Sequence, residues 1–140
     1  MKKLVLFVAM LSAFSAKSQS TATTGNIKNT TTYNHNLLEG YFEVNVLKAG
    51  VINHYGVSYT LSPVPFSNVM TVQMATPHPM SLSGKIVDAS GTTLINWNPG
   101  DIGYRYKSNI DITSLNSGNY NFQVYDDAKN LVKTISFVKP

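Results

Sequence analysis

The sequence predicts an all-β protein, an antiparallel β-sandwich of seven to eight short strands. Apolar and polar residues alternate in short runs, and Gly, Pro, Asn and Asp residues separate these runs, which is typical of sandwiches and barrels. No window places apolar residues at helical spacing over three turns. The connections are too short for the crossovers that parallel strands need, so we expect antiparallel pairing.

The N-terminus has the three parts of a secretory signal peptide, which we expect to span residues 1–18. A lysine pair precedes an apolar run at residues 4–11, and Ala16 and Ser18 supply small residues before a cleavage site at Gln19. The apolar run falls short of the roughly 20 residues that a bilayer span requires. We therefore expect no membrane span after cleavage, and a secreted protein located in the periplasm, at the cell surface or outside the cell.

Residues 19–36 are rich in Thr, Asn and Ser and contain little that could be buried, so we interpret them as a flexible leader. Residues 37–140 are expected to form a single β-sandwich domain. The chain contains no cysteine. Packing alone must therefore hold the domain together, and thiolate metal sites and cysteine nucleophiles are excluded.

Each expected strand in the first half of the domain is an alternating run that ends at a turn signal. Tyr-Phe-Glu-Val-Asn-Val-Leu predicts the first strand, and Val-Ser-Tyr-Thr-Leu predicts the second, which stops at Ser-Pro-Val-Pro. Val-Met-Thr-Val-Gln-Met places three apolar residues on one face, and the fourth run ends at Ala-Ser-Gly. The expected strands are residues 41–47, 57–61, 69–74 and 82–88.

The second half of the domain repeats this pattern. Thr-Thr-Leu-Ile-Asn-Trp is the hairpin partner of the preceding strand, and Asn-Pro-Gly-Asp at residues 98–101 predicts a turn. The sixth run ends with two isoleucines in phase, and a turn at residues 126–130 separates the seventh run from the eighth. These four strands are expected at residues 92–97, 104–112, 119–125 and 131–138.

The seventh strand begins with the pattern of a tyrosine corner. Tyr120, Phe122 and Val124 alternate with polar residues, and each contributes roughly 1.5–3 kcal/mol when buried. Leu115 lies five residues before Tyr120, with a bend at Gly118 between them. In such a corner the tyrosine hydroxyl bonds to the backbone a few residues upstream, so we expect Leu115, Gly118 and Tyr120 to be structural. The corner favours a sandwich of the immunoglobulin or fibronectin-III type.

Several segments of the second half resemble small immunoglobulin-like domains exported by Bacteroidota-type bacteria. They are Asp-Ala-Ser-Gly at residues 88–91, Ile-Asp-Ile-Thr-Ser-Leu-Asn-Ser-Gly-Asn-Tyr at residues 110–120 and the closing Phe-Val-Lys at residues 137–139. The resemblance covers about half of the chain, residues 69–140. It includes two groups: short secreted domains of unknown function, and the C-terminal sorting domain of type IX secretion cargo.

The position of one proline-rich element favours the first group. Sorting domains usually open with an element similar to Tyr-Pro-Asn-Pro, well ahead of their first hairpin, and follow a cargo domain. Here Thr-Pro-His-Pro at residues 76–79 lies close before Gly91, and only a short segment precedes it. The expected protein is therefore a stand-alone secreted module, with a sorting or surface-attachment domain as the alternative.

The charge of the mature chain argues against a nucleic-acid partner. Removing the three lysines of residues 1–18 leaves eight of the 11 basic residues against seven acidic ones, a net charge near +1. Arg105 is the only arginine and the lysines are scattered, whereas nucleic-acid affinity comes from clustered basic residues.

We expect no catalytic residues, no metal site and no cofactor. His35, His54 and His78 lie far apart and have no ligand spacing. The oxygen-rich turns at residues 88–90 and 126–130 lack the ligand density of an EF-hand, and Asp and Asn favour turns for backbone reasons alone.

Aromatic residues near one loop are the candidate ligand contacts. Trp97, Tyr104 and Tyr106 flank residues 98–103, although large aromatic residues are more often buried than displayed. The sequence thus predicts a secreted, non-catalytic module with a binding or structural role at the cell envelope or outside the cell. Its partner is an unidentified protein or glycan, and an aromatic-lined carbohydrate-binding module is a further alternative.

Overall fold

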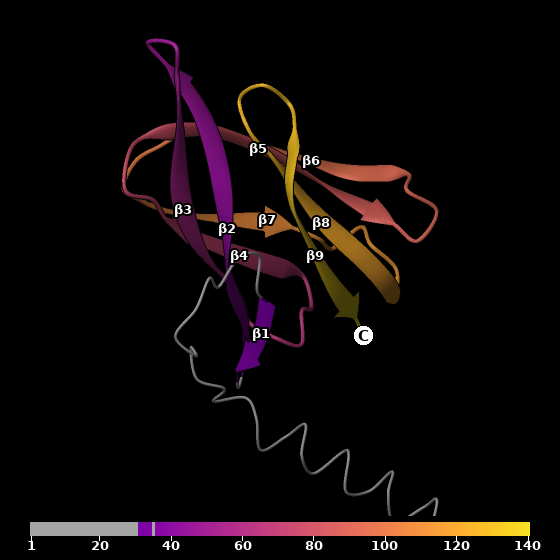
Figure 1. Ribbon diagram of the computed structural model, residues 1–140. Coiled ribbons are helices and arrows are strands. Elements are labelled where there is room, and N and C mark those ends of the chain that lie inside the picture. The colour runs from indigo at the N-terminus through magenta and orange to yellow at the C-terminus, as the bar shows by residue number, and fades with distance from the viewer. Residues whose placement is uncertain (1–30, 35) are drawn as a thin grey trace, which may run out of the picture.

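A computed structural model describes residues 31–34 and 36–140, which form strands, turns and loops. Nine strands make two antiparallel sheets, one of five strands and one of four, that face each other (Figure 1). The predicted all-β sandwich is therefore confirmed. The expected signal peptide and most of the expected leader lie outside the described residues.

The five-stranded sheet has the order β1-β2-β3-β4-β7, and the four-stranded sheet has the order β6-β5-β8-β9. All eight expected strands are present, and a ninth, β1, lies in the segment that we interpreted as a leader. The strands of the first sheet are β1 (Thr31–Asn34), β2 (Leu37–Lys48), β3 (Val51–Ser62), β4 (Val69–Ala75) and β7 (Arg105–Asp111). Those of the second are β5 (Met80–Asp88), β6 (Thr93–Ile102), β8 (Gly118–Tyr125) and β9 (Leu131–Lys139).

β2 and β3 are longer than the sequence pattern suggests, and they form a hairpin that extends beyond the sandwich. Ala49 and Gly50 connect them with φ values of 51° and 77°, as a tight hairpin turn with two left-handed residues requires. β3 pairs with β4 only over residues 58–62. The outer half of the hairpin therefore projects from the body of the molecule (Figure 1).

The turn expected at residues 98–101 is instead part of β6. Gly100 pairs with Leu82 and Trp97 pairs with Gly84, so the register shifts between them as in a β-bulge. Gly100 has a φ of 74°, which suits glycine. β6 lies at the edge of its sheet, where Pro99 costs no ladder hydrogen bond on the open side.

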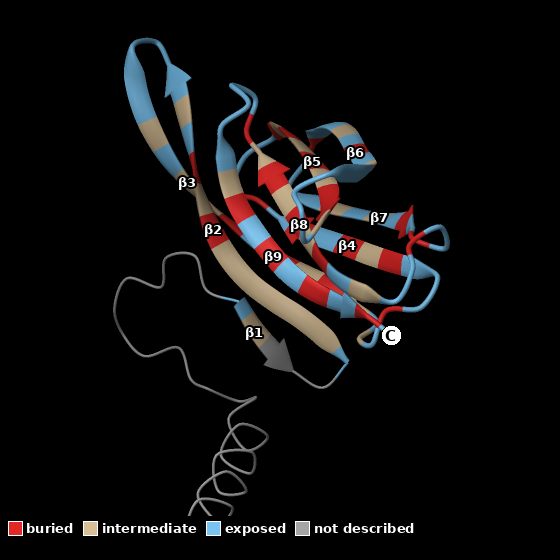
Figure 2. Cartoon of the chain, turned by 90° about the vertical axis from the view of Figure 1, so that its right-hand side faces the viewer, coloured by how far each residue is buried: buried red, intermediate tan, exposed pale blue. Residues whose placement is uncertain are grey.

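The core lies between the two sheets and is formed by the alternating side chains of both. Phe42, Val57 and Leu61 of the first sheet are fully buried, as are Ile86 and Phe122 of the second. The buried positions alternate with exposed ones along β4 and β9 (Figure 2). This period of two confirms the alternation on which the strand assignments were based.

Candidate functional site

A groove lies beside the projecting hairpin. It has a volume of about 440 Å³. One wall is formed by residues 44–48 of β2 and Tyr55 of β3, and the other by residues 78–81 and 126–128. The groove therefore lies between the hairpin, the start of β5 and the turn that joins β8 to β9.

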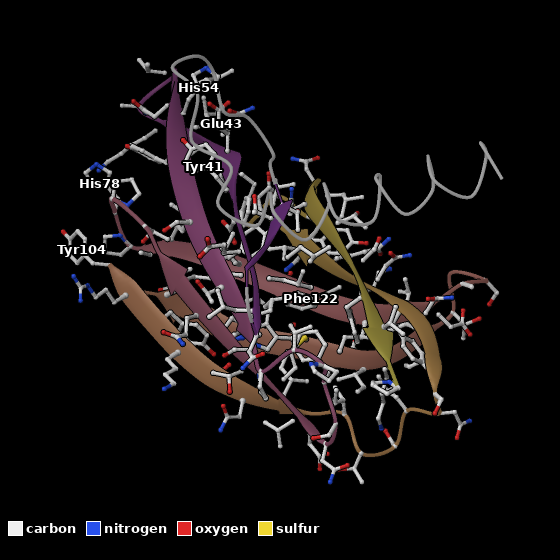
Figure 3. All side chains as sticks on the ribbon, turned by 90° about the horizontal axis from the view of Figure 1, so that it is seen from below. Tyr41, Glu43, His54, His78, Tyr104 and Phe122 are labelled. Carbon is white, nitrogen blue, oxygen red and sulfur yellow. The ribbon has the colours of Figure 1, made fainter. Side chains whose placement is uncertain are left out.

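The hairpin places apolar side chains in solvent around this groove. Leu47, Val51 and Ile52 at its tip are all more than half exposed, and Leu47 pairs directly with Ile52. Across the groove the rings of Tyr55 and His78 are in contact, with centroids 4.7 Å apart. Figure 3 shows His78 and His54 at the periphery of the molecule, well away from the core residue Phe122. The groove is thus lined by apolar side chains, such as Val46 and Met80, and by polar ones, such as Lys48 and Asp127.

Asp126, which lines the groove, uses its carboxylate to hold a turn. It is buried, and its two oxygens accept hydrogen bonds from the backbone N–H of Asn130 (2.8 Å) and from the Asn130 side-chain amide (3.1 Å). Asp88 accepts from the backbone N–H groups of Ser90 and Thr92, both at 2.9 Å. The Ser90 hydroxyl also donates a hydrogen bond to the Asp88 carboxylate. This bond, together with the backbone bonds, lowers the pKa of Asp88. In both oxygen-rich turns, the carboxylate therefore holds backbone N–H groups of its own turn in place.

No group of three or more His, Asp or Glu side chains that could hold a metal ion occurs within residues 31–34 and 36–140. The described part of the chain also contains no helix long and apolar enough to cross a membrane.

Trp97, a candidate ligand contact, lies between the two sheets and is only 6% exposed. Its ring makes edge-to-face contacts with Phe122 (centroids 5.5 Å apart) and Tyr106 (5.8 Å). Its Nε1 donates a hydrogen bond to the Ser108 hydroxyl across the sandwich (3.3 Å). The side chain thus joins β6 of one sheet to β7 of the other.

Tyr106 and Tyr104 are placed differently from each other. Tyr106 is half-buried against Trp97, whereas Tyr104 is exposed at the periphery (Figure 3). Tyr104 shares its parity with Ile110 and Ile112, which favours an inward side chain, but β7 begins only at Arg105 and Tyr104 lies outside the strand. The Tyr104 carbonyl accepts from the Thr76 backbone N–H (3.0 Å). The structure therefore does not bring the three aromatic residues together on one exposed surface.

Leu115, Gly118 and Tyr120 form the arrangement expected of a tyrosine corner. The Tyr120 hydroxyl donates a hydrogen bond to the Asn116 carbonyl (2.7 Å). Leu115 is buried in the core, and Gly118 is the first residue of β8.

The sequence analysis missed a second side chain that stabilises this corner, the buried Lys139. Its Nζ donates hydrogen bonds to the carbonyls of Leu115 (2.6 Å) and Ile112 (2.7 Å). The signal was present, because Lys139 is in phase with the buried Ile135 and Phe137 of β9. A lysine in an inward phase needs polar partners, and the turn carbonyls supply them.

Gly84 permits the close packing of Trp97 against β5 and β8. A Cβ at this position would lie 2.9 Å from the Trp97 ring and 2.9 Å from the Gln123 carbonyl oxygen. We expect Gly84→Ala to destabilise the protein by about 1–3 kcal/mol through overpacking and to shift the Trp97 fluorescence. Urea unfolding measures both effects. Gly103→Ala is the control, because a Cβ there meets nothing within 4 Å. Equal losses for the two variants would contradict the proposed contact.

Taken together, the fold and the groove define a small antiparallel β-sandwich module with a projecting hairpin. Within this class, the chain belongs to the family of secretion system C-terminal sorting domains, whose model matches residues 60–138. The match covers the end of β3 and all strands from β4 to β8, with nearly the whole of β9. No curated protein and no solved structure shows significant similarity to the chain.

Family membership implies a protein that is exported to the cell surface or beyond it. It supports the sorting-domain alternative, whereas the sequence analysis favoured a stand-alone module. The match begins at residue 60, before the start of the resemblance seen in the sequence. The hairpin strand β2 and most of β3 lie outside the matched residues.

Proposed function

We propose that the chain is a non-catalytic sorting and surface-attachment module of type IX secretion. The family match across six strands of the sandwich carries this proposal. In this proposal residues 1–18 direct the chain across the inner membrane, and the sandwich then directs it to the cell surface. Its partner is a protein of the export apparatus or a surface glycan, with no nucleic acid and no membrane span involved.

The packing of the matched strands supports recognition of the folded sandwich surface by the proposed partner. Hydrogen bonds from Tyr120 and Lys139 hold the backbone of the corner at residues 112–120. This end of the sandwich therefore has a fixed conformation. Trp97 between the sheets and the corner at Tyr120 also support an immunoglobulin-like arrangement. The glycan-binding alternative draws no support from Trp97, because that ring is buried.

The proposal can be tested by export of a reporter protein. The reporter is inserted between residues 18 and 19, and the fusion is produced in a bacterium that has type IX secretion. We expect the reporter at the cell surface or in the medium, and in the periplasm when the same host lacks the outer-membrane translocon of this system. A stand-alone binding module would leave the reporter in the periplasm of both strains, and this result would overturn the proposal.

A further inference from the structure

A row of four side chains crosses the five-stranded sheet from β2 to β7. Tyr41 of β2 pairs with Ser58 of β3, which pairs with Ala75 of β4, which in turn pairs with Arg105 of β7. Neighbouring backbones in such a row lie about 4.8 Å apart. The row therefore places an aromatic ring and a guanidinium at the two ends of a line of small side chains.

This row lies on the outer face of the sheet, away from the core. Phe42 and Val57 are buried between the two sheets, and side chains alternate along a strand. Tyr41 and Ser58, which are their neighbours in sequence, therefore face outward, and the members of the row on β4 and β7 are exposed. Figure 3 shows Tyr41 well away from the core residue Phe122.

A second row lies beside the first on the same face and adds polar groups. In the strand order β2, β3, β4 and β7 it consists of Glu39, Thr60, Gln73 and Lys107. Lys107 is exposed two residues after Arg105. The β7 end of the two rows is therefore cationic, the middle carries hydroxyl and amide groups, and the β2 end carries a carboxylate.

The middle of the two rows is hollowed into a trough of about 390 Å³. Short side chains form its floor, and the two long cationic side chains of β7 form one of its walls. We call this hollow the outer trough. The outward-facing residues that line it are Ser58, Thr60, Gln73, Ala75, Arg105 and Lys107.

Tyr41 borders the outer trough on the β2 side, and Gly56 makes room for its ring. A Cβ at Gly56 would overlap Cε2, Cζ and the hydroxyl oxygen of Tyr41. The ring therefore leans over the backbone of β3, in the space that a side chain at residue 56 would occupy. Tyr41 is only partly buried, so the side of the ring that faces away from β3 is open to a ligand.

These groups together match the chemistry of an acidic sugar. The C–H face of a sugar ring packs on an aromatic ring, and hydroxyl and amide groups bond to sugar hydroxyls. The guanidinium of Arg105 suits a carboxylate, which it can bind with two parallel hydrogen bonds. Three strand spacings separate Tyr41 from Arg105, about 14 Å, which a single sugar ring cannot bridge. Glu39 at the far end would repel a densely charged polyanion but can accept hydrogen bonds from neutral sugar hydroxyls.

We propose that the outer trough binds an oligosaccharide that carries a uronic acid, with the carboxylate on Arg105 and Lys107 and a neutral sugar ring on Tyr41. This site differs from the aromatic set that the sequence suggested, in which Trp97 is buried. It also goes beyond the proposed sorting role, which requires no sugar. Binding is measured on the purified protein, so a failure to bind would leave the outcome of the export experiment unchanged.

The first test is titration calorimetry of the exported protein with a xylotriose that carries one glucuronic acid. We expect binding, and a dissociation constant about tenfold or more higher for neutral xylotetraose, which has no carboxylate for the cations. Arg105→Gln should abolish this difference, whereas the control Lys48→Gln, at the exposed hairpin tip, should preserve it. Absence of binding by the acidic sugar would overturn the proposal. Equally tight binding of triglutamate would also overturn it, in favour of an acidic peptide.

The second test concerns the aromatic end of the outer trough. Tyr41→Ala should weaken binding of the acidic sugar by about tenfold or more, because it removes the surface on which a sugar ring packs. Gly56→Ala should also weaken binding, since its Cβ displaces the same ring. Tyr104→Ala is the control, because Tyr104 is exposed but does not line the trough. If Tyr41→Ala binds the sugar as tightly as Tyr104→Ala does, the proposed site is wrong.

Discussion

Tyr120→Ala is expected to cost about 3–5 kcal/mol of unfolding free energy, because it deletes a large buried aromatic side chain. The Tyr120 ring is 8% exposed and packs beside Phe137, with centroids 5.7 Å apart. Tyr120→Phe keeps this packing and removes only the hydroxyl that bonds to the Asn116 carbonyl. It should therefore cost less, about 1–3 kcal/mol.

Urea unfolding of the two variants and of Asn121→Ala would test this order. Asn121 lies one residue further along β8, and its side chain accepts a hydrogen bond from the exposed Ser136 hydroxyl. Replacement by alanine should change stability by no more than about 0.5 kcal/mol, as is usual at the surface. If Asn121→Ala were the most damaging of the three, β8 would face the opposite way and the assignment of the core would be wrong.

Lys139→Met is the second substitution with a large expected effect, a loss of roughly 3 kcal/mol or more. Methionine keeps the length and apolar stem of the side chain but removes the ammonium group that donates to the Leu115 carbonyl and to the Ile112 carbonyl, which then keeps only the Leu115 backbone N–H. Each hydrogen bond from a charged group contributes about 1.5–3 kcal/mol. Thermal or urea unfolding measures the loss, and Lys107→Met on the exposed face of β7 is the control. Equal stability of the two variants would show that the corner does not need Lys139.

The two sites should also be coupled, because they hold adjacent carbonyls of one loop. Tyr120 bonds to Asn116, and Lys139 bonds to the neighbouring Leu115. Once Lys139→Met has loosened this loop, Tyr120→Phe should cost less than it does in the wild type. A double-mutant cycle should give an interaction energy of about 0.5 kcal/mol or more. Strict additivity would mean that the two side chains act on the loop independently.

The sequence alone was sufficient to predict eight of the nine described strands of the sandwich. Alternation has a period of two, and it depends on local side-chain order that can be read without knowing any partner strand. For this reason all eight expected strands are present, and the corner at Leu115, Gly118 and Tyr120 was recognisable. The missed element, β1, is short and polar, and β2 and β3 extend beyond the alternating runs that predicted them.

The tertiary structure decided how these strands combine. The pairing of β4 with β7, the burial of Trp97 and the use of Lys139 as a donor inside the molecule all depend on contacts between residues far apart in the chain. The groove lies beside the part of the hairpin that extends past the ladder between β3 and β4. Alternation determines which side of a strand is apolar, but not which strand will cover it. Long-range packing makes that choice, and among the described strands it places none beside residues 41–48 of β2 on the side opposite β3.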